Sequence, residues 1–158
     1  MKTLLISYSR TGRTQAHMTW LKDALSAERM LTVRTKRPHT GLFGTLRACR
    51  DMISGYAEIE PPDLPPDMGS YDLVVLGGPV WAGRAAAPLR TFVKLYGQGI
   101  RCCAYVITHA SADPCDKALD DLDVLTGVSR CAALSAGKGD TDAEDKREAF
   151  VKTVLEML

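Results

Sequence analysis

The sequence predicts an α/β fold with three layers, in which helices cover both faces of a five-stranded parallel β-sheet. Five short apolar runs alternate with segments of helical periodicity, the pattern expected of parallel strands joined by right-handed crossover helices. Residues 73–76 and 105–107 are continuously apolar, which is typical of strands buried on both faces. At 158 residues the chain has the usual size of one domain, so we expect a single domain over residues 1–158.

The individual elements follow from this pattern. The apolar runs predict strands at residues 2–8, 30–35, 71–76, 101–108 and 129–135. Between and after them, side-chain periodicity and terminal signals predict helices at residues 15–27, 43–56, 86–96, 114–123 and 143–158. Four of the eight prolines lie in residues 60–70, so this segment should be an extended connection.

The composition narrows the possible partners. The net charge of +1 favours neither an acidic nor a basic partner, and we expect no nucleic acid to bind. No apolar run is long enough for a signal peptide or a membrane-spanning helix. The five cysteines include no C-x-x-C pair, which predicts neither a disulfide framework nor a zinc site. We therefore expect a cytoplasmic protein with no metal and no membrane partner.

Basic residues gather between Arg29 and Arg50. Such charge runs most often form a solvated face. The sequence lacks both the G-x-G-x-x-G pattern of dinucleotide-binding folds and a Walker loop, so these two modes of phosphate binding are not predicted.

Ligands of open parallel sheets bind beyond the carboxyl ends of the strands, which directs attention to three loops. The first contains Ser9, Arg10, Thr11, Gly12, Arg13 and Thr14. Its hydroxyls and glycine fit an ordinary capped turn, but they also fit a phosphate cradle at a helix amino terminus. The two arginines could contact such a ligand or remain solvated.

The second loop is expected at residues 77–84. Its candidate binding residues are Pro79, Val80, Trp81, Ala82 and Gly83. The small neighbours of Trp81 could leave its ring available for stacking on a planar ligand, although the ring could instead fold inward as part of the core.

The third loop begins at Thr108, His109 and Ala110 and continues to residue 113. His109 could hydrogen-bond the edge of a ligand ring, or it could simply end a strand. The other two histidines, His17 and His39, have no obvious partners in the sequence, so we expect them on the surface.

Two stretches carry a resemblance to a known family. The first loop within ISYSRTGRT and the segment YDLVVLGGPVWAGRAAAPLRTFV resemble the flavodoxin family, particularly its short flavodoxin-like proteins. The resemblance covers the chain to about residue 96 and includes GLFGTLRACRDMISGYAEIE. It implies the strand order 2-1-3-4-5 and a bound flavin mononucleotide (FMN). The phosphate would lie in residues 9–14, and the flavin ring between residues 79–83 and the loop beginning at His109.

The resemblance also implies a redox function, for which three alternatives remain. The first is an FMN-dependent oxidoreductase that takes electrons from a reduced nicotinamide or a protein donor and passes them to a quinone-type acceptor. The second is an electron carrier between protein partners. The third is an interaction domain that has lost its flavin, because the third loop lacks the glycine or stacking tyrosine common in the family.

Overall fold

A computed structural model describes residues 1–110 and 115–157 of the chain. Its strands are β1 (Thr3–Ser7), β2 (Arg29–Thr32), β3 (Leu73–Trp81), β4 (Arg84–Ala85), β5 (Cys103–His109) and β6 (Ala132–Gly137). Its helices are α1 (Arg13–Ala24), α2 (Gly41–Ser54), α3 (Ala87–Tyr96), α4 (Asp116–Thr126) and α5 (Ala143–Met157), with a short 3-10 turn η1 (Met68–Ser70). The predicted helix start at Pro114 lies outside the described residues.

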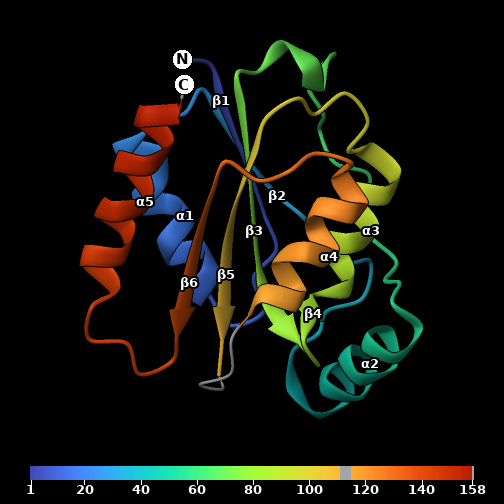
Figure 1. The fold of residues 1–158 in the computed structure, drawn as a ribbon. Helices are drawn as coiled ribbons and strands as arrows, with labels where there is room; N and C mark the ends of the chain where they lie inside the picture. Colours follow the sequence, from blue (N-terminus) through green and yellow to red (C-terminus); the bar gives the residue numbers. More distant parts are fainter. Residues whose placement is uncertain (111–114, 158) are drawn as a thin grey trace.

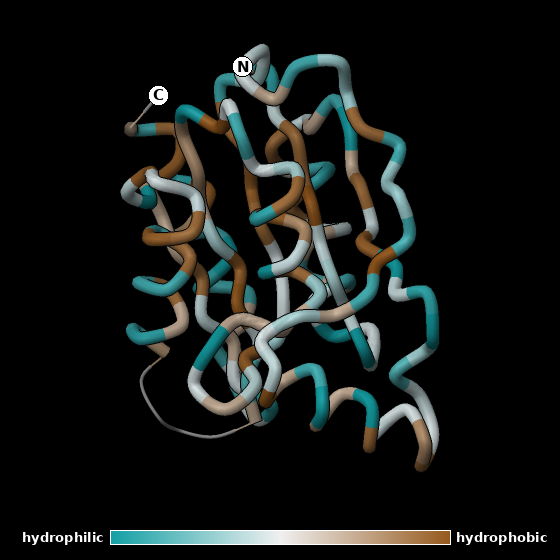
Figure 2. Tube along the Cα trace, turned by 90° about the vertical axis from the view of Figure 1, so that its right-hand side faces the viewer, coloured by the Kyte–Doolittle hydropathy of each residue, from teal (hydrophilic) through white to brown (hydrophobic). Residues whose placement is uncertain are grey.

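The parallel strands follow the order β2-β1-β3-β5-β6, which confirms the predicted order 2-1-3-4-5. Helices α1 and α5 cover one face of the sheet, and α3 and α4 cover the other (Figure 1). Alternate residues of β1 supply the two cores: Leu4 and Ile6 pack on the α3/α4 side, whereas Leu5 packs on the α1/α5 side. Figure 2 shows these apolar strands running between the helices. The three-layer prediction is therefore confirmed.

The third strand differs from its prediction. It continues beyond residue 76 to Trp81 and then turns back as β4, so that Val80 pairs with Ala85 and Trp81 with Arg84. Ala82 and Gly83 form the turn with positive φ values of 48° and 75°, as a tight hairpin of this kind requires. The expectation of a loop over residues 77–84 was thus wrong for residues 77–81, which belong to β3, and for Arg84, which belongs to β4.

The two glycines inside β3 let the helices approach the sheet closely. A Cβ at Gly77 would lie 2.7 Å from the Met18 sulfur of α1, and one at Gly78 would lie 2.8 Å from Leu89 Cδ2 of α3. Glycine therefore serves packing here, not a turn.

Helix α2 lies apart from the two helical layers, at the edge where the parallel strands end (Figure 1). The face that it turns to the protein consists of small and polar residues, Gly44, Ala48 and Asp51. Gly55, in the left-handed conformation, ends the helix. In the part of the chain that the structure describes, no helix is both long and apolar enough to cross a membrane.

Candidate functional site

The first loop connects β1 to α1 at the carboxyl edge of the sheet. Gly12 adopts φ 87° immediately before the helix, and its N–H donates to the Ser9 hydroxyl at 3.0 Å. Thr11 and Gly12 are exposed, and a Cβ at Gly12 would meet no atom within 4 Å. The first turn of α1 contains no acidic residue. Because the first N–H groups of a helix lack intrahelical partners, this exposed end can accept an anion.

Two other residues of the loop tie α1 to the neighbouring strands. The Thr14 hydroxyl is buried and lies 2.8 Å from the Thr108 hydroxyl of β5. The Arg13 guanidinium donates to the carbonyl of His109 at 3.2 Å and to that of Ala136 at 3.5 Å. Arg13 thus brings positive charge to this edge while holding the ends of β5 and β6 in place.

The other arginine of the loop, Arg10, reaches toward α2. Its Nε donates to the His39 carbonyl at 2.8 Å, and a terminal nitrogen donates to the Thr45 hydroxyl at 2.5 Å. Both arginines of the loop are therefore partly engaged by the chain itself, an arrangement that the sequence left open.

A buried polar network lies beneath this loop, and sequence reasoning missed it. His39 Nε2 is 2.9 Å from Asp51 Oδ2, and His39 Nδ1 is 2.7 Å from the Tyr8 hydroxyl. Each of the three residues is only 4% exposed. The expectation of a surface His39 was wrong, because its partners come from β1's end and from α2, far from it in sequence. No local signal identifies such a partner set.

The direction of one of these hydrogen bonds follows from its chemistry. The Asp51 carboxylate, which also accepts from Arg50 at 2.9 Å, is the acceptor, so His39 Nε2 donates to it. In the second contact, the tautomer of the ring decides whether the Tyr8 hydroxyl or His39 Nδ1 is the donor. Burial raises the pKa of the Tyr8 phenol well above its usual range; Arg10 lowers it and Asp51 raises it further. Tyr8 therefore keeps its proton at neutral pH.

Trp81 stands beside this network at the end of β3. Its ring centroid lies 5.7 Å from that of Tyr8 and 5.6 Å from that of His39, both in edge contact. The side chain is half-buried against the core on the α3/α4 side. Trp81 thus combines the two alternatives left open by the sequence: it packs against the core and remains partly exposed.

The remaining candidates of the second loop are placed by the β3–β4 hairpin. Pro79 pairs with Thr108 in the sheet, and its carbonyl accepts from the Ala86 N–H at 2.9 Å. Val80 is half-buried, whereas Ala82 and Gly83 are exposed at the tip. The hairpin therefore holds Trp81 on a supported strand end instead of a free loop.

The third loop begins where β5 ends. Thr108 is buried, His109 is the last residue of the strand, and Ala110 is exposed. His109 Nε2 lies 3.0 Å from the Ser135 hydroxyl of β6. Residues 111–113, which the prediction included in this loop, lie outside the described residues.

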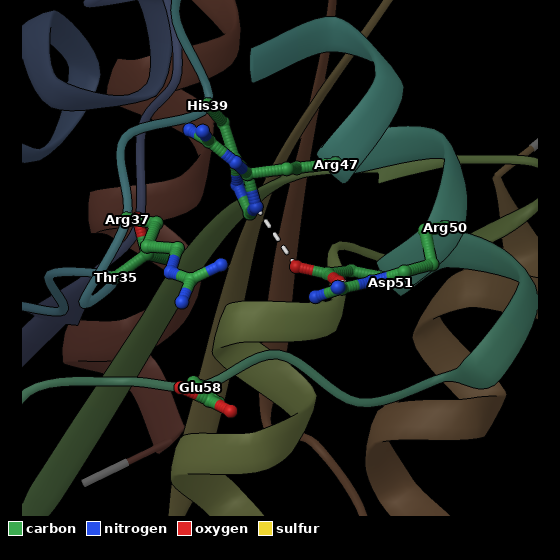
Figure 3. A pocket seen from close by; sticks show the side chains of 7 residues that line it. All are labelled: Thr35, Arg37, His39, Arg47, Arg50, Asp51 and Glu58. Atoms are coloured by element: carbon green, nitrogen blue, oxygen red, sulfur yellow. Dashed lines mark hydrogen bonds and ion pairs between the residues drawn. The ribbon is translucent and has the colours of Figure 1, made fainter. Parts of the chain in front are cut away.

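A small cavity opens on the outer side of His39. Its volume is about 70 Å³, and it is lined by Thr35, Arg37, His39, Arg47, Arg50, Asp51 and Glu58. Figure 3 shows Arg37 reaching between the His39–Asp51 contact and Glu58. Within residues 1–110 and 115–157, no cluster of three or more His, Cys, Asp or Glu side chains is placed to hold a metal ion.

Comparison with known proteins establishes the fold. No family model and no curated protein matches the chain. Among solved structures, a flavoprotein from Lactobacillus acidophilus in complex with FMN is 21% identical, with a TM-score of 0.71 over 91% of this chain and 97% of its own. A candidate flavoprotein from Bacteroides eggerthii is 18% identical, with a TM-score of 0.76 over 97% and 98%. A Streptococcus pneumonia flavodoxin is 12% identical, with a TM-score of 0.61 over the full length of both chains. The chain has a flavodoxin-like fold.

Proposed function

We propose that the chain is a cytoplasmic FMN-binding oxidoreductase that takes electrons from a reduced nicotinamide or protein donor and passes them to a quinone-type acceptor. The observation that carries this proposal is the exposed amino terminus of α1 at the carboxyl edge of the sheet, the edge at which β3 ends with Trp81. The FMN complex of the L. acidophilus flavoprotein, which has the same fold, supports the choice of ligand.

The residues present fit the two ends of this cofactor. For the phosphate, the first turn of α1 offers backbone N–H groups and the exposed Thr11 hydroxyl, with the Arg13 charge behind them. These donors can bind the phosphate without a lysine. For the ring, Trp81 offers a partly exposed aromatic surface on a rigid hairpin. FMN, when bound, supplies one- or two-electron chemistry.

The chain's own residues then have supporting roles. Tyr8, which stays protonated, and His39 support the Trp81 ring through T-shaped ring contacts. Arg13 fixes the ends of β5 and β6 from which the third loop departs. In this proposal, no side chain transfers a proton in the reaction. Binding, ring placement and the charge around the phosphate are the contributions of the protein.

Titration of the purified chain with FMN and with riboflavin, followed by flavin fluorescence, tests this proposal. Each hydrogen bond to a charged phosphate contributes about 1.5–3 kcal/mol, so loss of two of them should weaken riboflavin binding by about 100-fold or more relative to FMN. Failure to bind FMN would leave the interaction domain without flavin as the remaining alternative. Equal affinity for riboflavin would contradict the phosphate site.

Thr11→Glu should weaken FMN binding by at least about tenfold, because a carboxylate would face the phosphate. The same charge at the start of a helix does not destabilise the fold. Thr19→Glu, at an exposed position further along α1, is the matched control and should bind FMN as the unchanged protein does. Equal weakening in both variants would count against a phosphate at this loop.

An electron carrier without its own substrate is the second candidate. Oxidation of reduced nicotinamide by the FMN-loaded protein, with a soluble quinone as acceptor, separates the two. Steady turnover supports the oxidoreductase, whereas reduction only by a protein donor supports the carrier.

A further inference from the structure

The large apolar side chains of helix α2 point to solvent, whereas those of a helix that packs on a core point inward. Leu42, Phe43, Leu46 and Ile53 are 76%, 74%, 62% and 84% exposed, and the exposed Cys49 lies among them. Three of the four, at positions 42, 46 and 53, recur at intervals of four and seven residues and so share one face of the helix. We call these four side chains the α2 ridge.

The face toward the protein explains this reversal. Gly44, Ala48 and Asp51 form it, and a Cβ at Gly44 would lie 2.4 Å from the backbone of His39. Polar contacts hold the helix there, through Asp51 to His39 and through Thr45 to Arg10. The helix therefore needs none of its large apolar side chains for its own attachment. Exposed apolar side chains gathered on one helix are typical of an interaction site.

The segment that contains the ridge carries net positive charge. Residues 34–60 have five basic side chains and three acidic ones. Asp51 is buried and paired with His39 and Arg50, and without the Asp51–Arg50 pair four basic side chains remain against the exposed Glu58 and Glu60. Arg34, Lys36 and Arg37 are exposed. The only acidic residue of α2 itself is Asp51.

We propose that the α2 ridge docks onto the surface of an anionic phospholipid bilayer, with the apolar side chains in the interface and the flanking basic residues toward the headgroups. An apolar helix face bordered by arginine and lysine is the combination that binds such surfaces. The helix of 14 residues would lie flat over about 21 Å. A second copy of the chain is the less suitable occupant, because a stable dimer buries about 800 Å² on each partner and the ridge is four side chains on one helix.

The expectation of no membrane partner rested on the lack of an apolar run long enough to span a bilayer. Docking along the surface does not require such a run. If the proposed function holds, the consequence is direct: α2 lies at the sheet edge that carries the proposed flavin site (Figure 1), so docking would bring that site close to quinones dissolved in the lipid.

Co-sedimentation of the full chain, without flavin, with vesicles of phosphatidylcholine alone or with about 30% phosphatidylglycerol tests the proposal. The chain should sediment with the anionic vesicles and much less with the neutral ones. Leu46→Ser with Ile53→Ser should lower the partition coefficient by about tenfold or more. Val124→Ser, which removes an isolated apolar side chain on α4 that is 83% exposed, is the control and should change nothing.

The charge contribution has its own variants. Lys36→Gln with Arg37→Gln should weaken binding to anionic vesicles several-fold, and so should about 1 M salt, where the Debye length is about 3 Å. Lys94→Gln, at an exposed position on α3, should not. The two controls, Val124→Ser and Lys94→Gln, lie on α4 and α3, away from α2. Thermal unfolding of each variant should match that of the unchanged chain, which shows that the substitutions leave the fold intact.

Several results would overturn the proposal. These are no sedimentation with anionic vesicles, equal binding to neutral ones, or no loss in the Leu46/Ile53 variant. Analytical ultracentrifugation that finds a dimer dissociated by the Leu46/Ile53 substitutions would assign the ridge to a second copy. Because the vesicle assay contains no flavin, its failure is distinct from a failure of the FMN titration, which these variants should leave unchanged.

Discussion

The buried network of Tyr8, His39 and Asp51 shows how the stability of the fold can depend on single hydrogen-bonding atoms. Each polar atom of the His39 ring has one partner, at 2.7 Å and 2.9 Å, and the three residues are each only 4% exposed. Removing one member leaves an uncompensated polar group inside the protein. The network is therefore expected to contribute more to stability than its two hydrogen bonds would at the surface.

Tyr8→Phe should lower the free energy of unfolding by about 1–3 kcal/mol, because His39 Nδ1 loses its partner while the ring volume is kept. Denaturant unfolding measures this loss. Tyr56→Phe removes a hydroxyl from a tyrosine that is 52% exposed and should have no effect. A loss of similar size in both variants would show that the buried contact is not its cause.

His17 gives the chain a pH dependence. Burial lowers its pKa below the usual 6.5, and the positive charges of Arg147 and Arg13 lower it further, against a smaller opposing effect of Asp140. Its Nδ1 is buried and, within the described residues, has no hydrogen-bond partner. Below pH 6.5 the unfolded chain therefore binds the proton more readily than the folded one, and stability falls as the pH falls.

His17→Gln should remove this part of the pH dependence. Urea unfolding near pH 7.5 and near pH 5.5 should show a smaller loss of stability on acidification in the variant than in the unchanged chain. Identical losses in the two proteins would mean that His17 does not titrate in this range.

At the scale of elements, α2 depends on close backbone contact with the segment before it. Gly44→Ala should displace the helix and cost about 1–3 kcal/mol, since the new Cβ would meet the rigid His39 backbone. Gly139→Ala, where a Cβ would meet nothing within 4 Å, is the control. Thermal unfolding followed by circular dichroism compares the two, and an unaffected Gly44→Ala would contradict the observed packing.

The sequence predicted the number and order of the parallel strands and helices well. All five parallel strands and all five helices were found, within a few residues at most ends. The extension of β3 was missed because Gly77, Gly78 and Pro79 have the composition of a turn. Their glycines are needed for the approach of Met18 and Leu89, a requirement that exists only once the layers are packed.

The candidate site was predictable in position but not in detail. The loops after β1, β3 and β5 meet at one edge because parallel strands end together. What each side chain does there depends on partners distant in sequence. Thr14 bonds Thr108, and Arg10 bonds the His39 carbonyl. The periodicity of a sequence indicates which side chains are buried, but it does not predict which distant residues form hydrogen bonds.

At the scale of the whole molecule, the two faces of the sheet are packed independently. Gly77→Ala should cost about 1–3 kcal/mol on the α1 face, where a Cβ would meet Met18. Met18→Ala makes room for the new Cβ. The Gly77→Ala/Met18→Ala double variant should therefore lose about 0.5–3 kcal/mol less free energy of unfolding than the sum of the two single losses.

Gly78→Ala combined with Met18→Ala is the matched control for the double-mutant cycle of Gly77 and Met18. A Cβ at Gly78 would meet Leu89 on the opposite face, so these two effects should add. Denaturant unfolding of the single and double variants measures both cycles. Equal coupling in the two pairs would contradict independent packing of the faces.

The hydrogen bond from Arg10 to the His39 carbonyl joins the loop before α1 to the backbone on which α2 rests. If a bound anion draws Arg10 toward itself, the support of α2 changes with it. Thermodynamic linkage would make that relation reciprocal: occupancy of the α2 surface would alter the affinity of the loop by the same factor as occupancy of the loop alters that of the surface. Should both proposals hold, Arg10 is the residue that would connect the two sites.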